Sequence, residues 1–157
     1  MTYAVVLDTN TLGVLINPRA KHAAACIAWF EAMIHNGHHF YVPEIADYEL
    51  RRELIRIGSK SLDYLDRLPE MREIDYIPLT TEAMRLGAQL WARARQEGRP
   101  TAGAEALDGD VLISAQALIL QRTEERQVVV ATDNVRHISR FTAAKCWEDI
   151  DPATAAP

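Results

Sequence analysis

The feature that most constrains the fold is an alternation of short apolar runs with longer stretches of helical periodicity. Short, continuous apolar runs are typical of strands buried on both faces of a sheet. Such runs occupy residues 4–7, 40–42, 74–77 and 128–131. Helical patterns occupy residues 21–36, 44–57, 61–68, 81–97 and 110–122. This alternation predicts a three-layer α/β/α sandwich with a central, mainly parallel sheet of four to five strands.

The boundary before the helix at residues 110–122 is marked by two acidic residues. Either Asp108 or Asp110 is placed to cap this helix, because Asp is a favoured N-cap residue. The preceding residues 99–109 are rich in Gly, Ala, Pro and Thr, so we expect a mobile loop there.

The length and net charge of the chain limit the number of domains and the kinds of function to consider. The 157 residues predict a single domain over residues 1–150, followed by a disordered tail at 151–157. The 17 Lys and Arg against 22 Asp and Glu give a net charge of -5, which argues against gripping nucleic acid through bulk positive charge. The N-terminus has no secretion signal and no run is long enough to span a membrane, so we expect a cytoplasmic protein.

Two acidic residues occupy equivalent positions after predicted strands. Asp8 follows the first apolar run and Asp133 follows the last one closely. Asp8 is followed by Thr and Asn, and Asp133 lies between Thr and Asn. Each is also placed to serve as an ordinary helix cap. Ligands of an open parallel sheet bind beyond the carboxyl ends of its strands. The shared pattern therefore predicts that two neighbouring strands deliver carboxylates to one spot.

A third candidate is Glu49, in the helix at residues 44–57. At 100° per residue, Glu49 lies beside the apolar stripe of this helix, where a side chain can lean into a pocket. Glu53 lies nearer the stripe and is a rival. The alternative is a solvated face with weak charge pairs. The stripe consists of Ala46, Leu50, Leu54 and Ile57.

Four carboxylates in chain order resemble the acidic motifs of PIN-domain nucleases, which include VapC-type toxins. The pattern is Asp-Thr-Asn after the first strand, Glu-Leu in an early helix, Asp-x-Leu-Ile-x-Ala-x-Ala, and Thr-Asp after a later strand. The resemblance spans about residues 4–147 and favours Glu49 over Glu53 and Asp110 over Asp108. Gly109, between two Asp residues, departs from the family pattern. The four residues are Asp8, Glu49, Asp110 and Asp133.

The resemblance implies a function for these residues. The four carboxylates would be the catalytic, metal-holding residues of an endoribonuclease that cuts single-stranded RNA. Such toxins are paired with a small antitoxin protein, and homodimers are common among them. The supporting residues around the carboxylates would be Thr9, Asn10 and Thr132.

A short basic run and a histidine lie near the candidate carboxylates. The run is placed to receive the RNA backbone, although its options for internal charge pairs favour a solvated face. It consists of Arg51, Arg52 and Arg56. His137 follows Asp133 by one helical turn, which suits either a place near the metal or a packing role.

Carboxylates gathered in one pocket repel one another and protonate unless a cation neutralises them. Oxygen ligands without a Cys or His set favour Mg²⁺ or Mn²⁺. A cation there also reverses the local sign of the charge and lets a phosphate approach. The acidic composition is thus compatible with an RNA substrate.

Two other functions remain compatible with the sequence. A PIN-like module that binds RNA or protein without turnover would share the same motifs. A phosphohydrolase that forms an aspartyl phosphate also places Asp after its first strand, but it needs a second Asp where this chain has Asn10.

Overall fold

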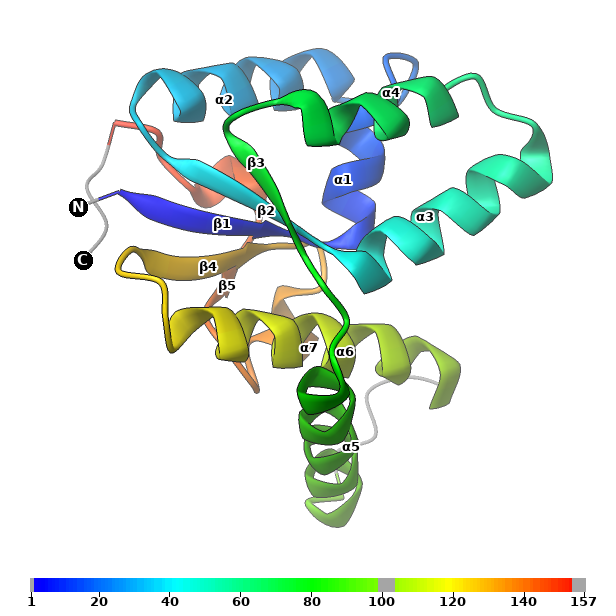
Figure 1. Cartoon of the computed structure of the whole chain (residues 1–157), viewed down its shortest axis with the longest axis vertical. Coiled ribbons are helices and arrows are strands. Elements are labelled where there is room, and N and C mark those ends of the chain that lie inside the picture. The colour runs from blue at the N-terminus through cyan, green and yellow to red at the C-terminus, as the bar shows by residue number, and fades with distance from the viewer. Residues whose placement is uncertain (1, 99–103, 154–157) are drawn as a thin grey trace.

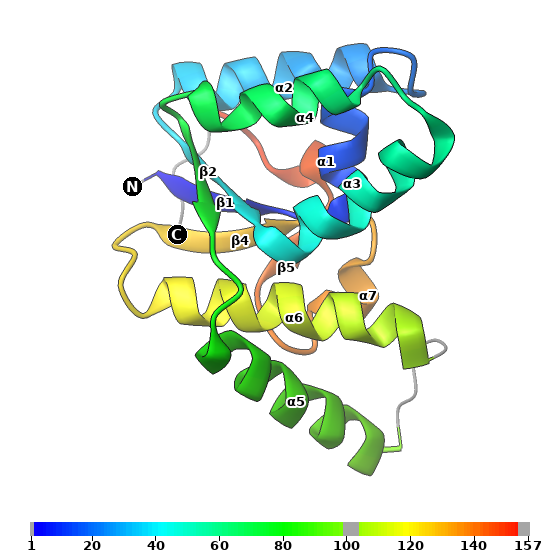
Figure 2. The same ribbon diagram turned by 45° about the vertical axis from the view of Figure 1, so that its right-hand side comes forward.

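The computed structural model describes residues 2–98 and 104–153. Within these ranges five strands form one sheet in the order β3-β2-β1-β4-β5, and every pairing is parallel. The strands are β1 (Tyr3–Leu7), β2 (His39–Pro43), β3 (Ile74–Ile77), β4 (Gln127–Ala131) and β5 (Ala144–Lys145). Helices cover both faces of the sheet (Figure 1, Figure 2). The predicted three-layer α/β/α sandwich is confirmed.

The helices form two unequal layers around the sheet. Figure 2 shows α1, α2 and α4 on one side of the sheet, and α6 on the other side with α5 outside it. Helix α3 lies beside the carboxyl ends of the strands. The helices are α1 (Thr9–Ile16), α2 (Ala23–His35), α3 (Glu44–Ile57), α4 (Leu62–Arg67), α5 (Thr81–Gln96), α6 (Ala104–Gln121) and α7 (Val135–Ile138).

Helix α1 was not predicted from the sequence. Its segment combines Gly13 with several β-branched residues, all of which lower helix propensity. Tertiary contacts override that propensity: Asp8 caps the helix, and Leu12 and Leu15 are buried in the core. The short elements α7 and β5 were also not predicted, because a four-residue helix and a two-residue strand are too short to show a periodic pattern of apolar residues.

The start of α6 corrects two expectations. The helix begins at Ala104, so residues 104–109 are helical rather than part of a loop, and residues 99–103 lie outside the described ranges. Neither Asp108 nor Asp110 is therefore its N-cap. The Gly- and Ala-rich composition predicted a loop, yet Gly109 is buried inside the helix.

The core is built on the buried strands. All five residues of β1 are buried, and an aromatic group covers the α2 side of the sheet. The ring centroids of Phe30 and Phe40 are 4.5 Å apart, and Trp29 meets Phe40 edge to face at 5.6 Å. Trp29 also donates its Nε1 hydrogen to the carbonyl oxygen of Ile150, at 2.9 Å, which anchors the end of the domain to α2.

Helix α3 has the predicted bounds but a shorter apolar stripe. Ala46 and Leu54 are buried, whereas Ile57 is 58% exposed. Ile57 lies in the last turn of α3. The stripe that holds α3 to the domain therefore ends before the helix does.

The first residues of the predicted tail contact the domain. His38 is buried and its Nε2 lies 3.0 Å from the carbonyl oxygen of Pro152, while its Nδ1 accepts a hydrogen bond from the backbone N–H of Tyr3 at 2.8 Å. Residues 154–157 lie outside the described ranges. None of the helices in the described part of the chain is long and apolar enough to cross a membrane.

Candidate active site

The candidate site lies where the direction of the strand order reverses. Chain order leads from β1 outwards to β2 and β3 on one side, and the sheet continues from β1 to β4 and β5 on the other. A crevice at such a switch point is the usual ligand site of an open α/β sheet. Leu7 of β1 pairs with Ala131 of β4, so Asp8 and Thr132 emerge side by side at this point.

Asp8 is buried and held by two donors. One carboxylate oxygen accepts a hydrogen bond from the backbone N–H of Thr9, at 2.6 Å, and the other accepts a hydrogen bond from the Thr132 hydroxyl. Burial raises the pKa of the Asp8 carboxyl; the two hydrogen bonds oppose this rise and the charge of Asp133 adds to it. The helix cap and the inward carboxylate are thus the same residue.

Glu49 reaches the site from α3. Its Oε1 accepts a hydrogen bond from the Thr9 hydroxyl at 3.0 Å, one residue from Asp8. Burial raises the pKa of Glu49, and the nearby charge of Asp8 also raises it. Its rival Glu53 is exposed and pairs with Arg56 on the outer face of α3. The structure therefore places Glu49, and not Glu53, beside Asp8.

Asp110 reaches the site from α6. Asp110 is buried, whereas Asp108 is exposed. Burial raises the pKa of Asp110 to about 6, the charges of Asp8 and Glu49 contribute to the rise, and His137 opposes it. The Nδ1 atom of His137 lies 3.4 Å from Oδ2 of Asp110. Asp110 is therefore the carboxylate of this pair that faces Asp8 and Glu49.

The last predicted carboxylate lies at the rim of the site. Asp133 is exposed, but its charge raises the pKa of Asp8 and of the thiols of Cys26 and Cys146. Because Cys26 is on α2 and Cys146 follows β5, Asp133 lies on the side of the site nearest these two elements. Asn10 is exposed on the first turn of α1. The core of the site thus consists of three carboxylates.

The three predicted RNA-binding arginines have different surroundings. Arg51 is engaged by two carboxylates: its Nε donates to Asp47 at 2.8 Å and its Nη1 donates to Asp66 at 2.6 Å. Arg56 pairs with Glu53, and Arg52 lies over the ring of Tyr48 at 5.2 Å while its charge lowers the pKa of Glu49. Arg51 thus ties α3 to α4, and Arg52 is the arginine that acts on the site.

Gly109 provides a contact that sequence reasoning did not identify. A Cβ atom at this position would lie 2.9 Å from each carboxylate oxygen of Glu49, which is closer than real Cβ contacts. The Glu49 carboxylate therefore lies against the bare backbone of α6. The sequence showed only that Gly109 departs from the family pattern, and its spacing alone gives no sign of this contact.

The donor set fits a hard divalent cation. The charge of Asp8 raises the pKa of Glu49 and of Asp110, the charge of Glu49 also raises the pKa of Asp110, and a cation would relieve that repulsion. Among the described residues, no three His, Cys, Asp or Glu side chains are close enough together to enclose a metal ion by themselves. Mg²⁺ commonly keeps several waters and uses only one or two protein carboxylates, so this open arrangement suits it.

The raised pKa of Asp110 predicts a pH-dependent stability of the metal-free protein. In the unfolded chain the Asp110 carboxyl titrates near 3.8, and in the fold it titrates near 6. The folded state therefore holds the proton more tightly, and stability falls as pH rises from about 4 to 6. Asp110→Asn removes this loss, so we expect it to stabilise the metal-free protein at pH 7 by up to about 3 kcal/mol.

Urea unfolding in EDTA checks this expectation. The stability of Asp110→Asn relative to the unchanged protein should grow between about pH 4 and pH 7 and then level off. A difference that stays constant over this range would contradict the raised pKa. Saturating Mn²⁺ should shrink the advantage of the variant at pH 7, because binding to the folded state stabilises it.

The fold is a three-layer α/β/α sandwich, and three carboxylates lie at the switch point of its sheet. Three solved structures with a similar fold are VapBC complexes. A chain of VapBC2 from Rickettsia felis, solved with a DNA fragment from its promoter, has a TM-score of 0.61 and 16% identity, and the match covers 94% of this chain and 99% of that one. The resemblance to VapC-type PIN domains is thus confirmed at the level of the fold.

Two further structures match equally well. DNA-bound VapBC from Salmonella typhimurium has a TM-score of 0.60 and 20% identity, covering 94% of this chain and 99% of that one. VapBC-1 from nontypeable Haemophilus influenzae has a TM-score of 0.59 and 19% identity, covering 95% and 100%. No protein-family model and no curated protein matches the sequence.

Proposed function

We propose that this protein is a metal-dependent endoribonuclease that hydrolyses phosphodiester bonds of single-stranded RNA, and that it is the toxin of a type II toxin–antitoxin pair. The observation that supports this most directly is the convergence of Asp8, Glu49 and Asp110 at the switch point of a PIN-like sheet. Asp133 would complete the acidic set from the rim.

The residues of the site have complementary roles in this proposal. Asp8, Glu49, Asp110 and Asp133 would hold Mg²⁺ or Mn²⁺. A bound cation of this kind supplies Lewis acidity toward a phosphate and lowers the pKa of water. Thr132 and Thr9 keep the Asp8 and Glu49 carboxylates turned inward through their hydroxyl hydrogen bonds. Asn10 and Arg52, at the edge of the site, would contact the RNA backbone.

The proposal of an antitoxin partner is supported by the similarity to chains of VapBC complexes and by an apolar groove. A cavity of about 650 Å³ lies between α2 and the α4 region. Its apolar walls include the half-buried side chains of Ile27, Ile34 and Met71. An amphipathic antitoxin segment would cover this surface. A short open reading frame beside the gene for this chain would support the pairing.

The decisive experiment compares RNA cleavage by the purified protein and by Asp8→Asn. We expect cleavage of a labelled single-stranded RNA that stops in EDTA and resumes with Mg²⁺ or Mn²⁺. Asp8→Asn should lower the rate about 100-fold or more, because it removes a carboxylate from the metal set. The same purification of the variant controls for contaminating ribonucleases.

Two results would contradict the proposal. Equal cleavage by Asp8→Asn would show that the activity does not come from this site. A protein that binds RNA but cleaves none with either metal would instead be the catalytically silent binding module.

A further inference from the structure

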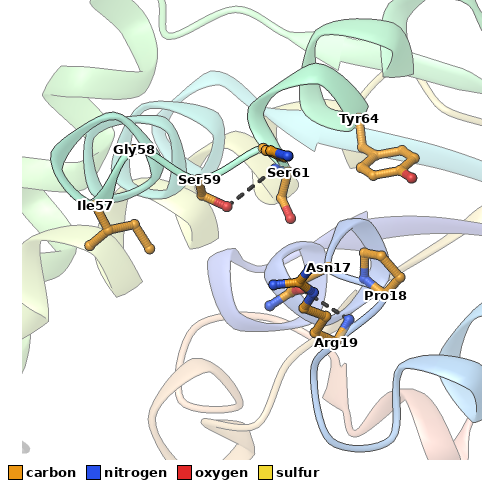
Figure 3. A pocket seen from close by; sticks show the side chains of 9 residues that line it. Asn17, Pro18, Arg19, Ile57, Gly58, Ser59, Ser61 and Tyr64 are labelled. Carbon is orange, nitrogen blue, oxygen red and sulfur yellow. Dashed lines mark hydrogen bonds between the residues drawn. The ribbon is translucent and has the colours of Figure 1, made fainter.

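A cleft that carries several polar and charged side chains lies at the far end of the helices that form the candidate site. It measures about 580 Å³ and opens between the end of α1 and the connection from α3 to α4 (Figure 3). Its walls carry two cationic side chains, three hydroxyl groups and one amide. The lining residues are Asn17, Pro18, Arg19, Ile57, Gly58, Ser59, Lys60, Ser61 and Tyr64.

The two cations of this cleft are uncompensated. Arg19 and Lys60 are exposed, and neither side chain forms a hydrogen bond or ion pair with the residues in ranges 2–98 and 104–153. Arg51 and Arg56 on the neighbouring helix are neutralised by carboxylates. In a chain of net charge -5, two free cations on one cleft form a local positive site.

Polar and aromatic groups of the cleft suit a nucleotide chain. Ser61 is only 8% exposed, its hydroxyl makes no hydrogen bond within the described part of the chain, and it is directed towards the Asn17 side (Figure 3). Tyr64, which is 51% exposed, borders the cleft beside Pro18. A phosphate accepts hydrogen bonds from cations and hydroxyls, and an exposed aromatic ring is a stacking surface for a base.

The cleft is connected to the candidate site by two helices. Helix α1 is flanked by its N-cap Asp8 and its C-cap Asn17, and α3 carries Glu49 and is followed by its C-cap Gly58. Asn17 follows Asp8 by nine residues, and Gly58 follows Glu49 by nine residues. At a helical rise of about 1.5 Å per residue, each pair is separated by roughly 14 Å. Figure 1 and Figure 2 show the two helices side by side, so an RNA strand at Asp8 would reach the cleft within a few nucleotides.

Helix dipoles weaken the positive charge of the cleft without reversing it. The C-terminal ends of α1 and α3 both face it, and each carries about half a negative charge. Arg19 and Lys60 contribute two full positive charges. A net positive cleft remains, although the same two side chains also suit a purely stabilising role at the helix ends.

We propose that this cleft binds the sugar-phosphate backbone of single-stranded RNA whose scissile bond lies at the carboxylates, with Arg19, Lys60 and Ser61 as phosphate partners. The inference rests on the proposed ribonuclease function and extends it by assigning a substrate subsite. It gives an acidic protein a specific place to hold a polyanion.

The experiment measures RNA binding in an Asp8→Asn background, where the substrate stays intact. Fluorescence anisotropy compares Asp8→Asn with the same chain carrying Arg19→Ala and Lys60→Ala. We expect the double variant to bind RNA with a Kd about tenfold higher. We also expect the slope of log K against log salt to be shallower by about 1.4, which is about 0.7 for each phosphate that the variant no longer neutralises. A dinucleotide, too short to reach the cleft, should bind both proteins equally.

The matched control removes two cations from another surface. Arg85 and Arg93 are exposed on α5, across the sheet from the cleft, and Arg85→Ala with Arg93→Ala makes the same change in net charge. This pair should leave Kd and the salt dependence nearly unchanged. An equal loss in both double variants would show that bulk charge, and not the cleft, holds the RNA.

Other outcomes separate this inference from the proposed function. If the unchanged protein cleaves RNA and the Arg19→Ala, Lys60→Ala variant binds RNA as tightly as its parent, the cleft assignment is wrong and the ribonuclease proposal stands. A lowered Tm with unchanged RNA affinity would assign the two cations to the helix ends and overturn the cleft. If the protein neither cleaves nor binds RNA, both proposals fail.

Discussion

Asp110→Asn is expected to slow metal-dependent RNA cleavage about 100-fold or more, whereas Asp108→Asn is expected to leave it within about twofold of the unchanged rate. The two residues differ by two positions on α6, and about 200° of helical rotation separates them. Asp110 is buried against Asp8 and Glu49, and Asp108 is exposed. Removing the Asp110 charge takes a carboxylate from the metal set, so we expect a loss of about 100-fold or more.

The pair of variants forms its own control, because both make the same chemical change in the same helix. Cleavage of single-stranded RNA and Mn²⁺ affinity by calorimetry are measured for each. Folding is monitored by Tm, which should not fall in Asp110→Asn because the variant removes a buried charge. Equal activity loss in both variants, or loss only in Asp108→Asn, would show that the site faces the other side of α6.

The central strands β1 and β4 could be predicted from sequence because each is a short apolar run that is buried along nearly its whole length. The equivalent positions of Asp8 and Asp133 also follow from the sequence, since parallel strands end at one edge of a sheet. The structure confirms that β1 and β4 are neighbours and pairs Leu7 with Ala131. Local pattern and topology were sufficient for this part of the fold.

The choice between Asp108 and Asp110 could not be made from the residues alone. Which of them faces the sheet depends on the phase of α6, and that phase depends on how the helix packs rather than on any cap. Only the family resemblance favoured Asp110. The same limit applied to Glu49 and Glu53, where helix geometry placed Glu53 nearer the stripe, but the hydrogen bond from Thr9 on α1 selects Glu49.

The role of Arg51 depends on partners far away in sequence. A basic run reads as a candidate RNA contact, and nothing nearby indicates that Asp66 will face Arg51 across the α3–α4 connection. Tyr76 on β3 donates its hydroxyl hydrogen to Asp47 at 2.8 Å and completes the group. Such a network forms only when the tertiary structure brings α3, α4 and β3 together.

Gly109→Ala is expected to weaken Mn²⁺ binding about tenfold, and RNA cleavage with it, without destabilising the fold. The added Cβ would stand 2.9 Å from both oxygens of the Glu49 carboxylate and push it from its place beside Thr9. Displacing a group that orients a metal site costs about 10- to 100-fold in affinity or activity. Replacing Gly by Ala inside a helix favours folding by up to about 1 kcal/mol, so Tm should hold or rise.

A second change in the same chain tests the cause. Glu49→Asp withdraws the carboxylate from α6 by one methylene, which makes room for the methyl group that Gly109→Ala adds. We expect Glu49→Asp to be harmful alone and less harmful in the Gly109→Ala background, a coupling that a double-mutant cycle measures. Gly13→Ala is the matched control, because its Cβ meets Leu50 at an ordinary 3.5 Å and should leave Mn²⁺ affinity unchanged. Simple additivity of the two losses would show that Gly109 acts on something other than Glu49.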